Sequence, residues 1–114
     1  MELNSFLTKL TSSPESIQFE ETISVIEANY TFSPSEFKNG EVMNLAGENN
    51  GSCKIFAFGN LQQLSVDQTL ACFGQFYRKD VLEFPENEDH QNIRNFIKFG
   101  WEGVQFSQQA LANK

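Results

Sequence analysis

The 114 residues of this chain are enough for one domain with a single core, and 12 of them are phenylalanine. Because each buried Phe removes roughly 150–250 Å² from water, this aromatic content predicts a folded protein rather than a disordered one. The net charge of −7 argues against a nucleic-acid binder and against attachment to an anionic membrane, since both need a basic face.

The cysteines and the short stretches of apolar residues indicate the cellular compartment in which the protein is expected. None of these stretches approaches the roughly 18 residues that a membrane span needs, and the first residues lack the pattern of a secretory signal. Cys53 and Cys72 are therefore expected to be reduced thiols in the cytoplasm. With no internal repeat and no linker, residues 1–114 are expected to form a single domain.

The first half of the chain alternates helical and extended patterns. Apolar residues at helical spacing predict a short helix over 3–10, which Pro14 follows, and a second helix from 19 to about 30. Residues 17–19 read as a short strand between these helices. A further strand region is expected near 36–42, where the Asn-Gly pair at 39–40 is typical of a hairpin.

The second half of the chain is mostly helical by pattern. Residues 52–64 favour a helix, although KIFAF within them also suits a buried strand. A capping box at 65–68 starts a helix whose apolar stripe continues to Tyr77. Asp89 is a candidate N-cap for a helix over 90–99, which Gly100 would end.

A last strand is expected near 103–106. Together the predicted elements describe a helix-rich α+β domain with four to five helices. Its small sheet is expected to contain short strands near 17–19, 36–42 and 103–106.

The polar turn GENNGSCK, residues 47–54, is the segment that packing explains least. A helix that begins near Ser52 would leave free backbone N–H groups at its start, and these groups suit an anion. The turn does not match a phosphate-binding P-loop, so nucleotide hydrolysis is not predicted. The alternative is a simple Asn/Gly loop with Ser52 as N-cap. The candidate ligand-binding residues are Asn49, Asn50, Gly51, Ser52, Lys54, Arg78 and Arg94.

The two arginines are included because a guanidinium can grip a carboxylate or a phosphate with two hydrogen bonds. The alternative for both is a surface ion pair with Asp80, Glu83 or Asp89.

A catalytic reading uses Cys53 as nucleophile and His90 as base. A helix start lowers the pKa of a thiol, and His90 is the sole histidine, with Asp89, Asn92 and Asn95 as residues that could orient its ring. Cys53 equally suits a small core residue. The spacing of Cys, His and acidic residues matches neither a zinc nor a calcium site, so no metal and no cofactor are predicted.

Four segments resemble the HopJ type III effector protein family, in the family's order. They are the short pattern FxNG (37–40) and the longer motifs GENNGSCKIFAF (47–58), QTLACFGQFYRKDVL (68–82) and DHQNIRNFIKFGWEG (89–103). The resemblance implies export into host cells by a type III secretion system. It brings no enzymatic activity, cofactor or catalytic residue. Residues 1–16 contain six Ser and Thr residues, which suits an export signal, but the predicted helix over 3–10 would have to come loose first.

The sequence therefore favours a small binding module over an enzyme. The expected ligand is a small anion, or the acidic or phosphorylated group of a protein partner.

Overall fold

The computed structural model describes residues 2–114 and confirms an α+β fold. Five α-helices follow in chain order: α1 (Leu3–Ser12), α2 (Phe19–Asn29), α3 (Asn50–Gln62), α4 (Val66–Ala71) and α5 (Gln91–Phe99). The strands are β1 (Tyr30–Phe32), β2 (Phe37–Asn39), β3 (Val42–Asn44), β4 (Val104–Phe106) and β5 (Leu111–Asn113). Single turns of 3-10 helix lie at Pro14–Ser16 and Gly100–Gly103, and a π-helical segment, η2, spans Phe76–Val81.

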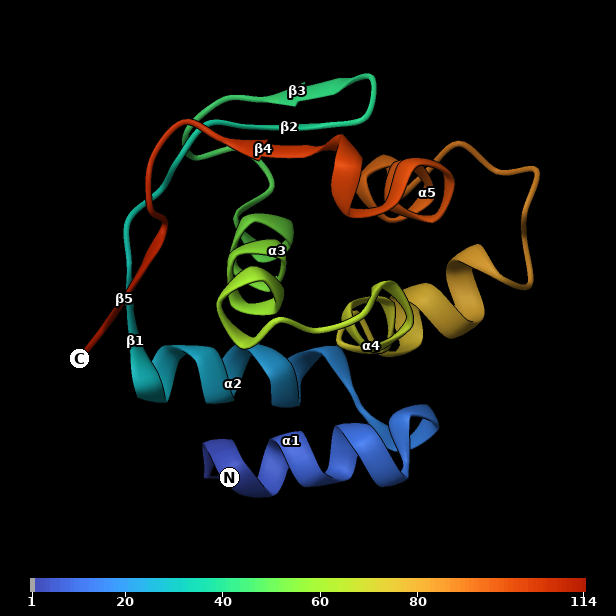
Figure 1. Cartoon of the computed structure of the whole chain (residues 1–114). Helices are drawn as coiled ribbons and strands as arrows, with labels where there is room; N and C mark the ends of the chain where they lie inside the picture. Colours follow the sequence, from blue (N-terminus) through green and yellow to red (C-terminus); the bar gives the residue numbers. More distant parts are fainter. Residues whose placement is uncertain (1) are drawn as a thin grey trace.

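The elements surround α3, which runs through the middle of the molecule (Figure 1). At one end lies a three-stranded antiparallel sheet in the order β3-β2-β4, with α5 beside it. At the other end α1 and α2 lie against each other, and β1 pairs with β5 in a separate antiparallel ladder. No helix among residues 2–114 combines the length and the apolar character that crossing a membrane requires.

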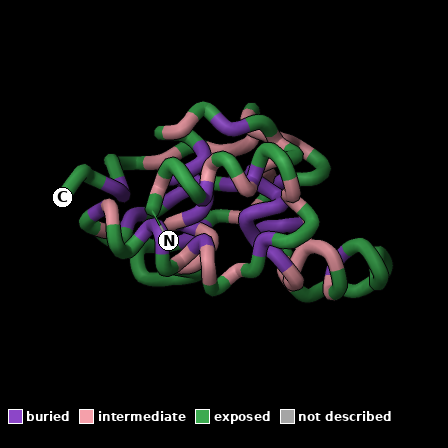
Figure 2. Tube along the Cα trace, turned by 90° about the horizontal axis from the view of Figure 1, so that it is seen from below, coloured by how far each residue is buried: buried purple, intermediate pink, exposed green. Residues whose placement is uncertain are grey.

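The core forms around Phe56 of α3, whose side chain is fully buried. Its ring centroid lies 4.9 Å from that of Phe96 in α5 and 5.5 Å from that of Phe73. Because neighbours cover α3 on all sides, Ile55 to Gly59 are buried without interruption, and this explains why KIFAF suits a buried strand as well as a helix. Figure 2 shows the buried segments inside a mostly exposed periphery.

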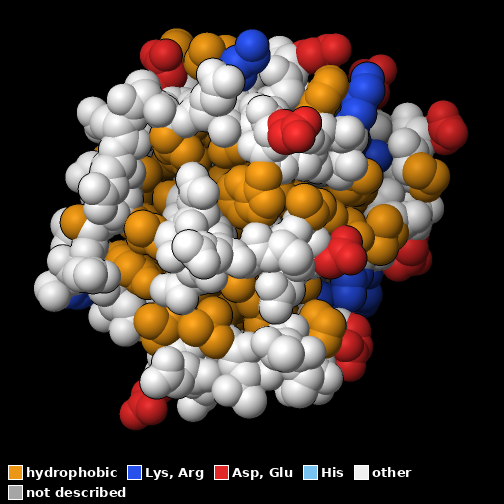
Figure 3. Space-filling model, viewed as in Figure 1, with side chains coloured by type: hydrophobic (Ala, Val, Ile, Leu, Met, Phe, Trp, Pro, Cys, Tyr) orange, Lys and Arg blue, Asp and Glu red, His pale blue; other side chains and the backbone are white. Residues whose placement is uncertain are grey.

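The charged side chains lie mainly around the rim of the face drawn in Figure 3, and hydrophobic atoms show between polar groups at its centre. Lys and Arg form no continuous patch on this face.

The expected strand at 17–19 is wrong. Ile17 and Gln18 are extended, but Gln18 is the N-cap of α2 and Phe19 is the first residue of that helix. Two side chains in or next to η2 make the hydrogen bonds that a neighbouring strand would otherwise make. Arg78 Nη2 donates to the Ile17 carbonyl at 2.6 Å, and Phe19 N–H donates to Gln75 Oε1 at 3.1 Å. The backbone is satisfied without a sheet.

The other predicted elements are confirmed with shifted boundaries. The hairpin turn at Gly40 joins β2 to β3, and β4 pairs with β2 in the register Phe37 to Phe106. The Ser65 capping box is present. The helix that follows it ends at Ala71 rather than continuing to Tyr77, because Gly74 takes a φ of +60° before η2 begins.

Candidate functional site

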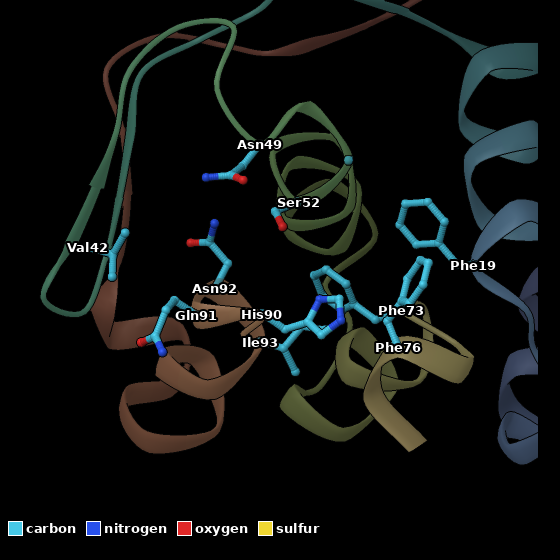
Figure 4. Close-up of a pocket in the computed structure, with 11 residues that line it drawn as sticks. Phe19, Val42, Asn49, Ser52, Phe73, Phe76, His90, Gln91, Asn92 and Ile93 are labelled. Carbon is cyan, nitrogen blue, oxygen red and sulfur yellow. The ribbon is translucent and has the colours of Figure 1, made fainter. Parts of the chain in front are cut away.

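A cavity of about 350 Å³ lies where the N-termini of α3 and α5 meet (Figure 4). Its polar side consists of Asn49, Gly51 and Ser52 at the start of α3 and of His90, Gln91 and Asn92 at the start of α5. Its apolar side consists of Phe19, Val42, Phe73, Phe76 and Ile93.

Both helices begin in the same unusual way. Their N-cap residues, Asn49 and His90, adopt left-handed backbone conformations with φ of 50° and 51°, and neither side chain caps its own helix. The first backbone hydrogen bonds run from Cys53 N–H to Asn49 O and from Arg94 N–H to His90 O. The first three N–H groups of each helix therefore have no partner within the helix.

The two helix starts bring partial positive charge to the cavity without a Lys or Arg side chain. Each helix N-terminus carries roughly half an elementary charge, and successive N–H groups that follow a left-handed residue form a concave anion site. Among the described residues, neither Lys nor Arg lines the cavity.

Four asparagines hold both helix starts against the sheet. Asn44 Oδ1 accepts hydrogen bonds from Asn49 Nδ2 at 2.7 Å and from Asn92 Nδ2 at 2.9 Å. Asn39 Nδ2 donates to the Asn92 backbone carbonyl at 2.8 Å. Asn39, Asn44 and Asn92 are buried, so these bonds are shielded from water and fix the position of one helix start relative to the other.

His90 is held on two sides. Its Nε2 lies 3.0 Å from Asp80 Oδ2, and its ring stacks on Phe76 with centroids 5.3 Å apart. A carboxylate can only accept a hydrogen bond, so Nε2 carries the proton and Nδ1 is an acceptor in the neutral ring. Asp80 belongs to η2, so the π-helical segment fixes the imidazole at the cavity wall.

The structure brings some of the predicted ligand residues together. Asn49, Gly51 and Ser52 line the cavity with His90, and the exposed Asn50 is the first residue of α3 beside them. The expected helix start at Ser52 is shifted, because α3 begins at Asn50 and places Ser52 in its first turn. The expected N-cap Asp89 is likewise replaced by His90.

The three basic candidates lie outside the cavity and contact other parts of the chain. Lys54 Nζ lies 3.5 Å from Glu27 of α2 and above the ring of Phe32. Arg78 donates to the Ile17 carbonyl, as described above.

Arg94 forms the alternative ion pair, with Nη2 2.7 Å from Asp89 Oδ1, and also donates to the backbone carbonyls of Asp80, Pro85 and Asp89. The hydrogen bond from Arg94 lowers the pKa of Asp89. Arg94 thus holds the loop between η2 and α5 in place.

The expected low-pKa thiol at Cys53 is contradicted. Its side chain is 1% exposed, Sγ lies 3.6 Å from the Ser35 carbonyl, and burial raises the pKa of the thiol. Cys53 does not line the cavity that holds His90. Within residues 2–114, no group of three His, Cys, Asp or Glu residues is placed to hold a metal ion.

Sequence reasoning missed the asparagines at 39, 44 and 92 as one cluster and Asp80 as the partner of His90. The sequence predicts Asn39 as part of a hairpin turn and Asn92 as a residue that could orient His90, and does not connect the two. The contacts that join Asn39 and Asn44 to Asn92 span 48 to 53 residues, so no local pattern reveals them.

Comparison with known proteins provides the family. No curated protein matches the chain. A solved structure described as "Crystal structure of unknown function protein VPA0580" is 63% identical, with a TM-score of 0.99, and the match covers 100% of this chain and 95% of that one. The family model described as HopJ type III effector protein matches residues 3–111. The chain therefore belongs to the HopJ type III effector family.

Proposed function

We propose that this protein is a binding module for a small anion, or for the acidic or phosphorylated group of a partner. The proposed site is the cavity between the N-termini of α3 and α5. The observation that supports it is that two helix starts, each with free N–H groups, line the same cavity.

Two helix ends together offer roughly one positive elementary charge. Because this charge comes from backbone groups, it is fixed in position and needs no ordering of a long side chain when the anion arrives. The Ser52 hydroxyl and the Gln91 amide line the same cavity and can donate further hydrogen bonds.

The asparagine cluster supports the proposal because it sets the distance between the two helix starts. Asn49 is the N-cap of α3 and Asn92 lies in the first turn of α5, and both donate to Asn44 Oδ1. A site that is already assembled loses little affinity to reorganisation on binding.

Titration of the ¹⁵N-labelled protein with inorganic phosphate tests the proposal. Amide shifts are expected to cluster at residues 50–53 and 91–94, at the two helix starts. Sodium chloride at matched ionic strength is the control, and it should shift these amides less than phosphate does. Scattered shifts, or none at millimolar phosphate, would contradict the proposal.

We further propose that the protein is exported by a type III secretion system, because its family is named for such effectors. The full chain fused to a translocation reporter should enter host cells from a bacterium with a working secretion system. It should remain inside an isogenic strain without one. Retention of the fusion protein in both strains would contradict the proposal of export and would not affect the proposal of anion binding.

A further inference from the structure

We infer that the natural ligand is an aromatic anion, with a flat ring directly attached to its anionic group. This inference rests on the proposed function, which gives the ligand its anionic group, and adds the aromatic ring attached to that group. It is drawn from the wall of the cavity that lies opposite the asparagines.

That wall is aromatic. Phe76 stacks on His90 at an interplanar angle of 29°, and Phe19 meets Phe76 edge-on with ring centroids 4.9 Å apart. Figure 4 shows Phe19, Phe73, Phe76 and His90 gathered on one side, Asn49, Gln91 and Asn92 on the other, and Ser52 between the two groups. Phe19 and Phe76 are only partly buried although a large core lies beside them. Their packing on each other and on His90 presents fixed ring surface to the cavity.

The aromatic and polar walls meet at Gly51. A Cβ atom at this position would lie 2.9 Å from Cζ of Phe19, so the absent side chain lets the phenyl ring reach the first turn of α3. The ring surface therefore begins where the free N–H groups are. A ligand that uses both walls needs its ring and its charge close together rather than joined by a long linker.

The size of the cavity limits the ligand further. Its volume of about 350 Å³ is near the lower end of the roughly 300–1,000 Å³ of small-molecule sites. This favours a single ring with one anionic group. Aryl carboxylates, aryl phosphates and aryl sulfonates all have this chemistry.

Three small probes separate the contributions of ring and charge, and the sulfonates among them stay ionised throughout the working pH range. Benzenesulfonate has both ring and charge, methanesulfonate has the charge alone, and benzenesulfonamide has the ring without the charge. Amide-shift titrations of the full chain give the affinity of each. We expect benzenesulfonate to bind roughly 2- to 10-fold more tightly than methanesulfonate, because this ratio corresponds to the free energy of one aromatic contact. Benzenesulfonamide should bind more weakly than benzenesulfonate.

The variant Phe76→Leu should narrow the affinity ratio between benzenesulfonate and methanesulfonate, because it removes one ring from the aromatic wall. Phe84→Leu is the matched control, because Phe84 is 55% exposed and does not line the cavity. The wild-type titrations remain decisive if the Phe76 variant does not fold.

Each unfavourable outcome has a different meaning. Equal affinity for the two sulfonates overturns the aromatic inference and leaves the anion site intact. Equal affinity for benzenesulfonate and benzenesulfonamide overturns the anion site itself. No binding of either sulfonate overturns both.

Discussion

The side chains of Asn44 and Asn92 exchange two hydrogen bonds, each Nδ2 donating to the Oδ1 of the other at 3.2 and 2.9 Å. Asn44 ends β3 and Asn92 lies in the first turn of α5, and both are buried. The pair satisfies two amides that would be costly to bury alone. It also fixes the helix start that forms half of the proposed site.

Asn44→Asp should destabilise the protein by about 2 kcal/mol or more, because it replaces the donor Nδ2 with oxygen facing Asn92 Oδ1 and the Phe37 carbonyl. Urea unfolding at neutral pH measures the change. Asn87→Asp makes the same substitution at an exposed site and serves as control. Equal midpoints for the two variants would show that the reciprocal pair contributes nothing to stability.

Gln91→Glu should weaken anion binding and leave the fold intact. A carboxylate at the first residue of α5 interacts favourably with the helix dipole, but it cannot make the hydrogen bond that the Gln91 amide donates to the Glu88 carbonyl, so the two effects oppose each other and stability should change by about 1 kcal/mol at most. The same charge at the cavity should lower phosphate affinity roughly 5-fold or more. Gln105→Glu, exposed on β4, is the control for net charge. Equal phosphate affinities in the two variants would rule out an anion site at α5.

Gly74→Ala should cost more stability than Gly47→Ala, although both glycines have positive φ values. A Cβ at Gly74 would lie 2.3 Å from the Phe19 backbone nitrogen, whereas nothing lies within 4 Å of one at Gly47. The left-handed conformation costs about 1–2 kcal/mol at either site, so the difference between the variants measures the clash. Similar thermal midpoints would mean that the backbone at the start of α2 moves easily away from Gly74.

Stability should fall as the pH rises above about 9, because burial raises the pKa of Cys72 from 9.0 to about 12. The unfolded chain ionises this thiol first, so its stabilising contribution is complete below pH 9 and decreases up to pH 12. The expected loss for this group is about 1.4 kcal/mol per pH unit in that interval. Urea unfolding under reducing conditions at pH 8.5 and 10.5 measures it.

Cys72→Ala is the control for this pH dependence and should show a shallower slope over the same interval. The burial of Cys53 and Tyr77 also raises their pKa values, so part of the slope should remain. An unchanged slope in the variant would assign the whole effect to these other groups.

Cys53 should resist alkylation by iodoacetamide at pH 7.5 in the folded protein and react after unfolding, since its thiol is buried and its pKa is raised. Mass spectrometry of the labelled peptide gives the rate. Fast labelling of the folded protein at neutral pH would restore the cysteine-dependent alternative.

Features of the fold that depend on local spacing could be predicted from the sequence. The apolar stripes identify α1, α2 and α5, and the Ser65 capping box identifies the start of α4. The strand at 17–19 could not be rejected locally. Its backbone is satisfied by Gln75 and Arg78, whose side chains come from 56 to 61 residues further along the chain.

The candidate site also contains residues that local sequence predicts and residues that only the tertiary structure identifies. Residues 49–52 were recognisable from turn chemistry, but only the fold shows that α5 begins at the same cavity. The placement of Lys54 depended on the packing of α3, which turns this side chain toward Glu27 of α2. The role of Arg94 depended on the path of the loop that it holds.

The docking of α1 has a consequence for any passage of this chain through a secretion channel. Phe6 is fully buried, and its ring meets Phe58 of α3 edge-on with centroids 5.9 Å apart. Pulling on residues 3–12 would draw Phe6 away from Phe58 and expose this part of the core to water. Extraction of this chain through a channel from its N-terminal side would therefore begin with the loss of core packing rather than with the release of a loose tail.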